Sequence, residues 1–123
     1  MNPSQSKKDE YKKIYTKAKP SLLKLAKELY IDDISDNFFL EVVIPLSDYF
    51  NSFREKNIPY LIGFTGGQGS GKTTLSIFIQ QILKEIFNKR AIGFSIDDIY
   101  KTKKERDKVA RNIHPLCSVR GVP

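Results

Sequence analysis

The residues best suited to chemistry form one short stretch, Gly66-Gly67-Gln68-Gly69-Ser70-Gly71-Lys72-Thr73. It fits the pattern G-x-x-x-x-G-K-[ST], in which the glycines let backbone N–H groups turn inward around a chain of phosphates. In this pattern the lysine, here Lys72, contacts the β- and γ-phosphates, and the hydroxyl of Thr73 binds Mg²⁺. The stretch predicts a nucleoside triphosphate site made by Gly66, Gly67, Gln68, Gly69, Ser70, Gly71, Lys72, Thr73 and Thr74. A glycine-rich turn that binds nothing is the alternative.

Two acidic residues, Asp97 and Asp98, follow an apolar run over residues 91–96. In an open parallel sheet, functional groups collect outside the carboxyl ends of the strands, and the glycine stretch also follows an apolar run. We therefore expect one of the two carboxylates to face the γ-phosphate. A carboxylate there accepts the proton of an attacking hydroxyl or holds the metal. The alternative is that the pair only ends a strand and caps the next turn.

The elements that must position these residues follow from hydrophobic spacing. Residues 60–64 and 91–96 are short apolar runs typical of buried strands. Between them, residues 72–87 place apolar side chains at helical spacing, so residues 60–96 have the length of one strand–helix–strand unit. Thr102 and Glu105 form a capping box that predicts a polar helix to about Asn112.

The first 57 residues are expected to form a helical lead-in to the α/β part. Residues 1–20 predict a frayed helix or tail, and residues 21–29 predict an amphipathic helix that begins after Pro20. Asp36 is the expected cap of a further helix that extends to about residue 56. Pro45 should kink that helix or begin its second half. We expect two parts, the lead-in at 1–57 and an α/β part at 58–123.

Composition limits the classes of protein to consider. The 123 residues are 40% apolar and 28% charged, which is enough for at most one domain. One cysteine excludes an internal disulfide framework, and no apolar stretch suits a secretory signal or a membrane span, so we expect a cytoplasmic protein. The net charge of +7 comes from the two ends, since residues 1–30 carry eight lysines against three acids and residues 101–123 carry seven Lys or Arg against two acids. Nucleic-acid binding is disfavoured because no platform of aromatic side chains, on which bases could stack, is interleaved with these lysines.

Three motifs in residues 60–123 resemble those of D-glycerate 3-kinase and of the wider group with uridine kinase, phosphoribulokinase and pantothenate kinase. They are GFTGGQGSGKTTL, SIDDIY and RGVP. The resemblance implies a P-loop NTPase fold, a three-layer α/β/α domain around a parallel sheet. It also implies an ATP- and Mg²⁺-dependent kinase that moves the γ-phosphoryl group to a hydroxyl of a small molecule, with glycerate favoured. The family pattern has an aromatic residue where this chain has Ile99.

Residue by residue, the resemblance makes Lys72 and Asp97 catalytic, with Asp97 as the base for the acceptor hydroxyl. Asp98 is then a secondary candidate for the base, and Tyr100 and Arg120 resemble positions that line the acceptor pocket. Because a carboxylate at this place can also hold the metal, Asp98 is expected beside Thr73 as a metal ligand. In the family RGxP continues into GTHD, so this chain is expected to be an N-terminal fragment that is inactive alone and lacks the Walker B acid and lid. A non-catalytic nucleotide-binding module and a kinase for a nucleoside or other acceptor stay open, as does the oligomeric state.

Overall fold

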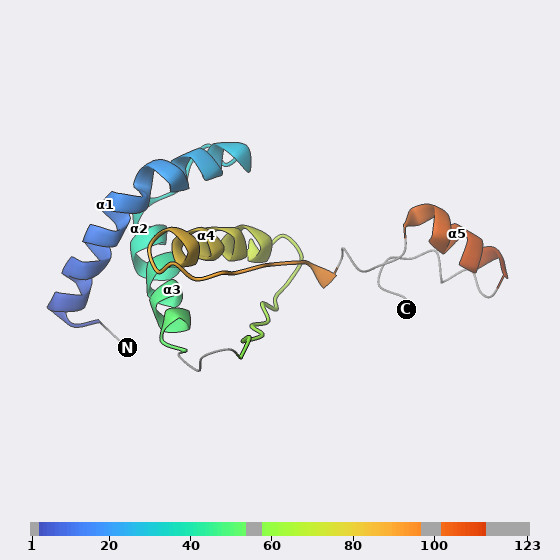
Figure 1. Ribbon diagram of the computed structural model, residues 1–123. Helices are drawn as coiled ribbons and strands as arrows, with labels where there is room; N and C mark the ends of the chain where they lie inside the picture. The colour runs from blue at the N-terminus through green and yellow to red at the C-terminus, as the bar shows by residue number, and fades with distance from the viewer. Residues whose placement is uncertain (1–2, 54–57, 97–101, 113–123) are drawn as a thin grey trace. The chain divides into compact units, whose positions relative to one another are not determined.

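The computed structural model describes residues 3–53, 58–96 and 102–112 (Figure 1). The chain divides into two compact units, Met1–Gly93 and Phe94–Pro123, and each is described by itself. The boundary expected at residue 57 stays a prediction. In the first unit, however, the helix after the glycine stretch packs directly on the helices of the lead-in. Among the described helices, none is long and apolar enough to cross a membrane.

The first helix, α1, runs without interruption from Gln5 to Glu28. The Ser4 side chain caps it by accepting a hydrogen bond from the Lys7 N–H. The predicted break at Pro20 is wrong: the proline lies inside the helix with its ring on the exposed face. The opposite face is buried in the core, and this packing stabilises the helix across the proline. Figure 1 shows that α1 curves along its length. Its buried residues are Tyr11, Tyr15, Ala18, Leu22 and Ala26.

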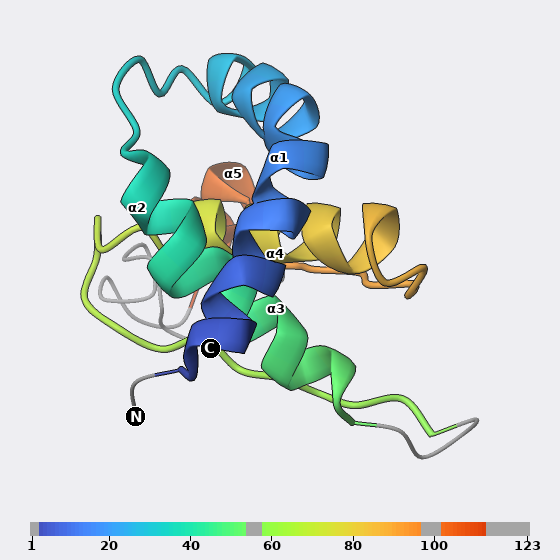
Figure 2. The ribbon, with the colours of Figure 1, turned by 90° about the vertical axis from the view of Figure 1, so that its left-hand side faces the viewer.

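Three successive helical segments follow: α2 (Asp36–Phe38), the π-helix η1 (Phe39–Val43) and α3 (Ile44–Asn51). They form one continuous rod (Figure 2). The N-cap is Ser35 rather than the expected Asp36, because the Ser35 hydroxyl accepts from the Asn37 N–H. The widened turn has a local cause: the Ile44 N–H donates to the Phe39 carbonyl five residues back, directly before Pro45, which has no N–H. Pro45 therefore lies in the first turn of α3. This confirms the expectation that Pro45 begins the second half of the helix.

The fourth helix, α4, runs from Lys72 to Glu85 and confirms the helix expected at that place. It contacts α1, η1 and α3, and Figure 2 shows α1 crossing it. The centre of this packing is aromatic, with the Phe39 ring 5.6 Å from Tyr15 and 5.1 Å from Phe78, measured between ring centroids. Ser21 of α1 also donates a hydrogen bond to the Glu85 carboxylate. The core therefore fixes the helix that follows the glycine stretch.

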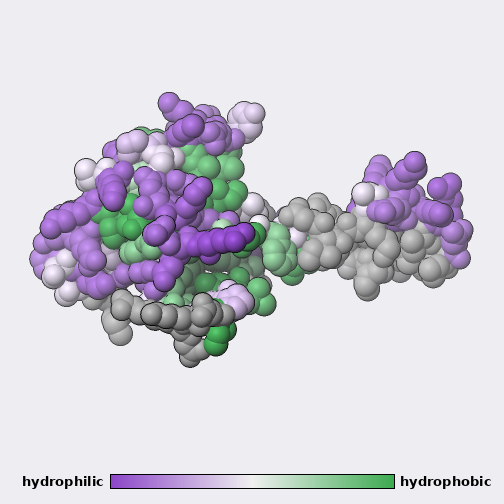
Figure 3. Space-filling model, in the orientation of Figure 1, coloured by the Kyte–Doolittle hydropathy of each residue, from purple (hydrophilic) through white to green (hydrophobic). Residues whose placement is uncertain are grey.

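Neither apolar run expected to be a strand forms one within the described parts of the chain, 58–64 and 91–96. Their side chains are largely exposed, with Leu61 at 92% and Ile92 at 76% of full exposure. Hydrophobic surface consequently appears beside the hydrophilic helix faces in Figure 3. A strand needs a partner for its backbone N–H and C=O groups, and no described segment pairs with either run. The parallel-sheet fold class stays a prediction.

The second unit contains α5, Lys103–Asn112, which confirms the helix expected after Thr102. The capping box is formed in full. The Thr102 N–H donates to Glu105 Oε2 at 2.8 Å, and the Glu105 N–H donates to Thr102 Oγ1 at 3.3 Å. Two N–H groups that the helix itself leaves without acceptors are thus satisfied reciprocally.

Candidate functional site

The glycine stretch forms a tight turn that leads directly into α4. The Ser70 N–H donates to the Gly67 carbonyl at 3.3 Å, and Gly69 and Gly71 have φ angles of 75° and 83°. These left-handed conformations suit glycine because it has no Cβ. The first bond of the following helix joins the Leu75 N–H to the Gly71 carbonyl at 2.9 Å. The preceding N–H groups of the first turn therefore have no acceptor within the helix, and such unpaired N–H groups at a helix N-terminus are suited to an anion.

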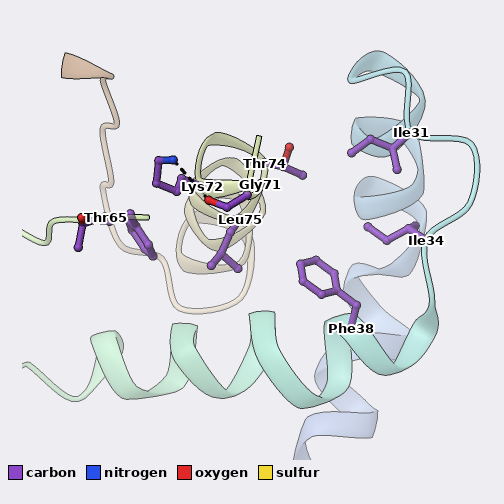
Figure 4. Close-up of a pocket in the computed structure, with 10 residues that line it drawn as sticks. Ile31, Ile34, Phe38, Thr65, Gly71, Lys72, Thr74 and Leu75 are labelled. Atoms are coloured by element: carbon purple, nitrogen blue, oxygen red, sulfur yellow. Dashed lines mark hydrogen bonds between the residues drawn. The ribbon is translucent and has the colours of Figure 1, made fainter. Parts of the chain in front are cut away.

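Lys72 folds back over the turn that precedes it. Its Nζ donates to the carbonyl oxygens of Gly66 and Gly67 at 2.9 and 2.6 Å, and lies 3.4 Å from Ser70 Oγ (Figure 4). An ammonium group needs several acceptors, and here the loop carbonyls supply them. The positive charge is thus held at the loop. If a phosphate binds there, its oxygens would accept the hydrogen bonds that the Lys72 ammonium now donates to the loop carbonyls.

A hollow of about 420 Å³ adjoins the loop (Figure 4). One side is the start of α4 with the loop before it, and the other side comes from the lead-in. The lead-in side is apolar and consists of Ile31, Ile34 and Phe38. The rest of the lining is Phe64, Thr65, Ser70, Gly71, Lys72, Thr74 and Leu75.

The lead-in side of this hollow was missed by sequence reasoning, which placed no site residue within residues 1–57. The missed signal was the placement of Ile31 and Ile34 among acidic residues. Both isoleucines are half-buried and pack on the core, whereas Asp32 and Asp33 between them are exposed. An apolar pair three residues apart in a polar turn indicates a side that faces the protein.

The structure brings only part of the predicted site together. Gly66 to Thr74 form the loop and the first turn of α4, and the Thr73 side chain lies at the exposed surface. Asp97, Asp98, Tyr100 and Arg120 lie outside the described residues. Among the residues that are described, no group of three or more His, Cys, Asp or Glu side chains is placed to hold a metal ion. The roles expected of these four residues stay predictions.

Among the residues that the structure describes, the shifted pKa values lie in the lead-in, away from the loop. Burial and the hydrogen bond to Asp36 raise the pKa of Tyr15 to about 12. The bonds from Tyr15 and Lys19 lower the pKa of Asp36, and the hydrogen bond to Asp48 raises the pKa of Lys7. Each group has a partner on another helix, so these shifts reflect how α1 is joined to α2 and α3. They are structural rather than catalytic.

Half of the chain is similar to two kinases. It is 38% identical over 66 residues to the uncharacterized kinase mug58 of Schizosaccharomyces pombe, which is 52% of this chain and 24% of that protein. It is 37% identical over 62 residues to uridine-cytidine kinase B of Dictyostelium discoideum, or 49% of this chain and 24% of that protein. The chain thus spans about a quarter of the length of the curated relatives that it matches. No protein family profile and no solved structure matches it.

Proposed function

We propose that the chain is the phosphate-binding part of an ATP-dependent kinase. One observation carries the proposal: two left-handed glycines, Gly69 and Gly71, form a turn that ends at a helix N-terminus, and the Lys72 ammonium lies on that turn. The turn, the unpaired N–H groups and the cation all favour a polyphosphate. The similarity to two proteins named as kinases supports the same class of activity.

The proposed reaction is in-line transfer of the γ-phosphoryl group to a hydroxyl. The acceptor oxygen bonds to the γ-phosphorus while the bond from that phosphorus to the β,γ-bridging oxygen breaks and ADP leaves. Lys72 and the loop N–H groups stabilise the charge, and Asp97 takes the proton of the acceptor hydroxyl. Thr73 and Asp98 would hold Mg²⁺, which neutralises phosphate charge when bound. Tyr100 and Arg120 are proposed to contact the acceptor.

Glycerate is the acceptor that the sequence motifs favour. A nucleoside is the second candidate, because one relative of the chain is named a uridine-cytidine kinase. The two are separated by measuring ADP formation from ATP with glycerate, uridine or cytidine, using protein from the complete reading frame. We expect ADP to form with one of these acceptors and Asp97→Asn to abolish it. Equal rates for wild type and Asp97→Asn would contradict the proposed role of Asp97.

Nucleotide binding can be tested on the 123-residue chain itself. Titration calorimetry with ATP and Mg²⁺ should show binding to wild type and a loss of at least tenfold in affinity for Lys72→Ala, since a charge-assisted contact to phosphate is removed. Lys24→Ala is the matched control, because Lys24 is an exposed lysine of α1 that forms an ion pair with Glu28 at 4.0 Å and lies outside the hollow. Absence of binding to wild type would overturn the proposal. Binding with no turnover by the complete protein would favour a non-catalytic nucleotide-binding module.

A further inference from the structure

The apolar side of the hollow is held rigidly in place by the end of α1. Tyr30 has a left-handed φ of 57°, its N–H donates to the Lys27 carbonyl at 3.0 Å, and the Ile31 N–H donates to the Ala26 carbonyl at 2.9 Å. These two bonds form a Schellman motif, which reverses the chain at a helix end and brings the residue after the turn back onto the helix. Ile31 is therefore fixed next to α1, and the segment that carries Ile34 continues from that fixed point.

The two ends of the site differ in chemistry. In Figure 4 the Lys72 ammonium lies on the side of α4 opposite Ile31, Ile34 and Phe38, whereas Thr74 lies on the side of α4 that faces Ile31. Phe38 directs its ring toward α4 (Figure 4). The cationic end thus suits the γ-phosphate, and the opposite end is apolar with one aromatic ring.

We propose that this hollow binds the planar base of the nucleotide whose phosphates the loop holds, and that the lead-in therefore forms part of the nucleotide site. The inference rests on the proposed function. A nucleotide bound with its γ-phosphate at Lys72 has its base at the other end of the phosphate chain, on the side of Thr74. There Ile31, Ile34 and Phe38 offer apolar surface to a base, which is apolar on both faces.

The dimensions of the hollow support a base as its occupant. Its volume of about 420 Å³ lies within the roughly 300–1,000 Å³ of small-molecule sites. At the end that faces Ile31 the lining combines apolar side chains with the hydroxyl of Thr74, whereas Ser70 Oγ lies at the other end, 3.4 Å from the Lys72 ammonium. Apolar side chains with a hydroxyl bind an aromatic ring through its faces and give the polar ring edge a hydrogen-bonding partner.

The test compares two ligands that share the phosphates but differ in the base: ATP and inorganic tripolyphosphate, each with Mg²⁺. Calorimetry on the 123-residue chain gives both affinities for wild type, for Ile34→Ser and for Ile34→Trp, which fills the hollow. We expect both variants to bind ATP about tenfold more weakly, or a change of about 1.4 kcal/mol, and to bind tripolyphosphate as wild type does. Leu23→Ser, a half-exposed position on α1 outside the lining, is the control and should change neither affinity.

The two proposals fail in different ways. If wild type binds both ligands but both Ile34 variants keep the wild-type ratio of the two affinities, the base-binding inference is overturned and the proposed function stands. If wild type binds neither ligand, the proposed function fails and the inference fails with it. A variant that does not fold loses tripolyphosphate binding as well as its circular dichroism. If both Ile34 variants fail to fold in this way, neither shows the selective loss of ATP binding that the base-binding inference requires, and the inference is overturned.

Discussion

The Tyr15 hydroxyl donates a 2.6 Å hydrogen bond to Asp36 Oδ1, and this bond joins the middle of α1 to the start of α2. Lys19 donates to the other oxygen of the same carboxylate at 3.3 Å. Beneath the hydroxyl, the Tyr15 ring stacks on Phe39 in the core. The bond requires a protonated tyrosine and is stronger to an ionised aspartate than to a neutral one, and it therefore makes the stability of this joint depend on pH.

The two shifted pKa values set the pH range of that stabilisation. The pKa of Asp36 is lowered by its hydrogen bonds. The contribution of Asp36 to the free energy of unfolding is therefore present above about pH 4 and is lost as the pH falls through the lowered pKa. The pKa of Tyr15 is raised to about 12. The contribution of Tyr15 to the free energy of unfolding is complete below about pH 10, the pKa of tyrosine in the unfolded chain. It is lost as the pH rises toward the pKa of Tyr15 in the folded chain. We expect Tyr15→Phe to be less stable than wild type mainly between these limits.

Urea unfolding of wild type and Tyr15→Phe at pH 3, 7 and 11.5 measures this range. The difference in unfolding free energy should be largest at pH 7 and smaller at both extremes. Tyr49→Phe is the control, because Tyr49 is an exposed tyrosine of α3. A difference for Tyr15→Phe that is the same at all three pH values would show that the bond to Asp36 does not stabilise the fold.

Phe78 of α4 belongs to the aromatic cluster at the centre of the core. It is fully buried, and its ring meets those of Phe38 and Phe39 edge to face, with centroids 6.4 and 5.1 Å away. Phe78→Ala should cost about 3–5 kcal/mol, the usual effect of removing a buried aromatic ring. Leu61→Ala, at a side chain that is 92% exposed, should change stability by less than about 0.5 kcal/mol. Equal effects in urea unfolding would mean that the aromatic cluster is not the core.

Local patterns in the sequence predicted the helices around the loop well. The stripe in residues 72–87 and the capping box at Thr102 and Glu105 depend on neighbours three or four positions away, and both are confirmed. The position of the glycine loop before a helix was predictable for the same reason. Such features need no information about the rest of the fold.

Predictions that depended on tertiary contacts were less reliable. Pro20 lies inside α1 because its ring faces solvent while the opposite face packs on the core, and that packing outweighs the missing hydrogen bond. A strand at residues 60–64 depends on partner strands, which no local pattern supplies. The spacing of Ile31 and Ile34 could have shown that both face the protein, but not that they face α4, because that requires knowing that α1 ends in a Schellman turn.

Thr102 should control how well α5 is formed. Its hydroxyl accepts from the Glu105 N–H at 3.3 Å and donates to the Glu105 carboxylate at 2.7 Å. Thr102→Ala removes both bonds and should destabilise the helix by about 1 kcal/mol. Hydrogen exchange of the amides in residues 103–112 should then become several-fold faster, whereas Lys103→Ala, at an exposed position of the first turn, should leave the rates nearly unchanged. Equal rates for wild type and Thr102→Ala would show that the cap does not stabilise α5.

Two glycines of the loop should respond differently to the same substitution. Gly71 has a φ of 83°, and an alanine there is strained by about 1–2 kcal/mol although no neighbour lies within 4 Å. Gly67 has no positive φ and an equally open surrounding. Gly67→Ala should therefore be neutral or stabilise the fold by up to about 1 kcal/mol, since alanine restricts the unfolded chain.

Thermal unfolding of Gly71→Ala and Gly67→Ala measures this contrast, and the two variants differ by the same added methyl group. If both lower the unfolding temperature equally, the effect is not due to the left-handed conformation at Gly71. If Gly71→Ala is neutral, the loop adopts a different backbone in solution. The Lys72 ammonium would then lose the carbonyl positions of Gly66 and Gly67 that now hold it over the loop.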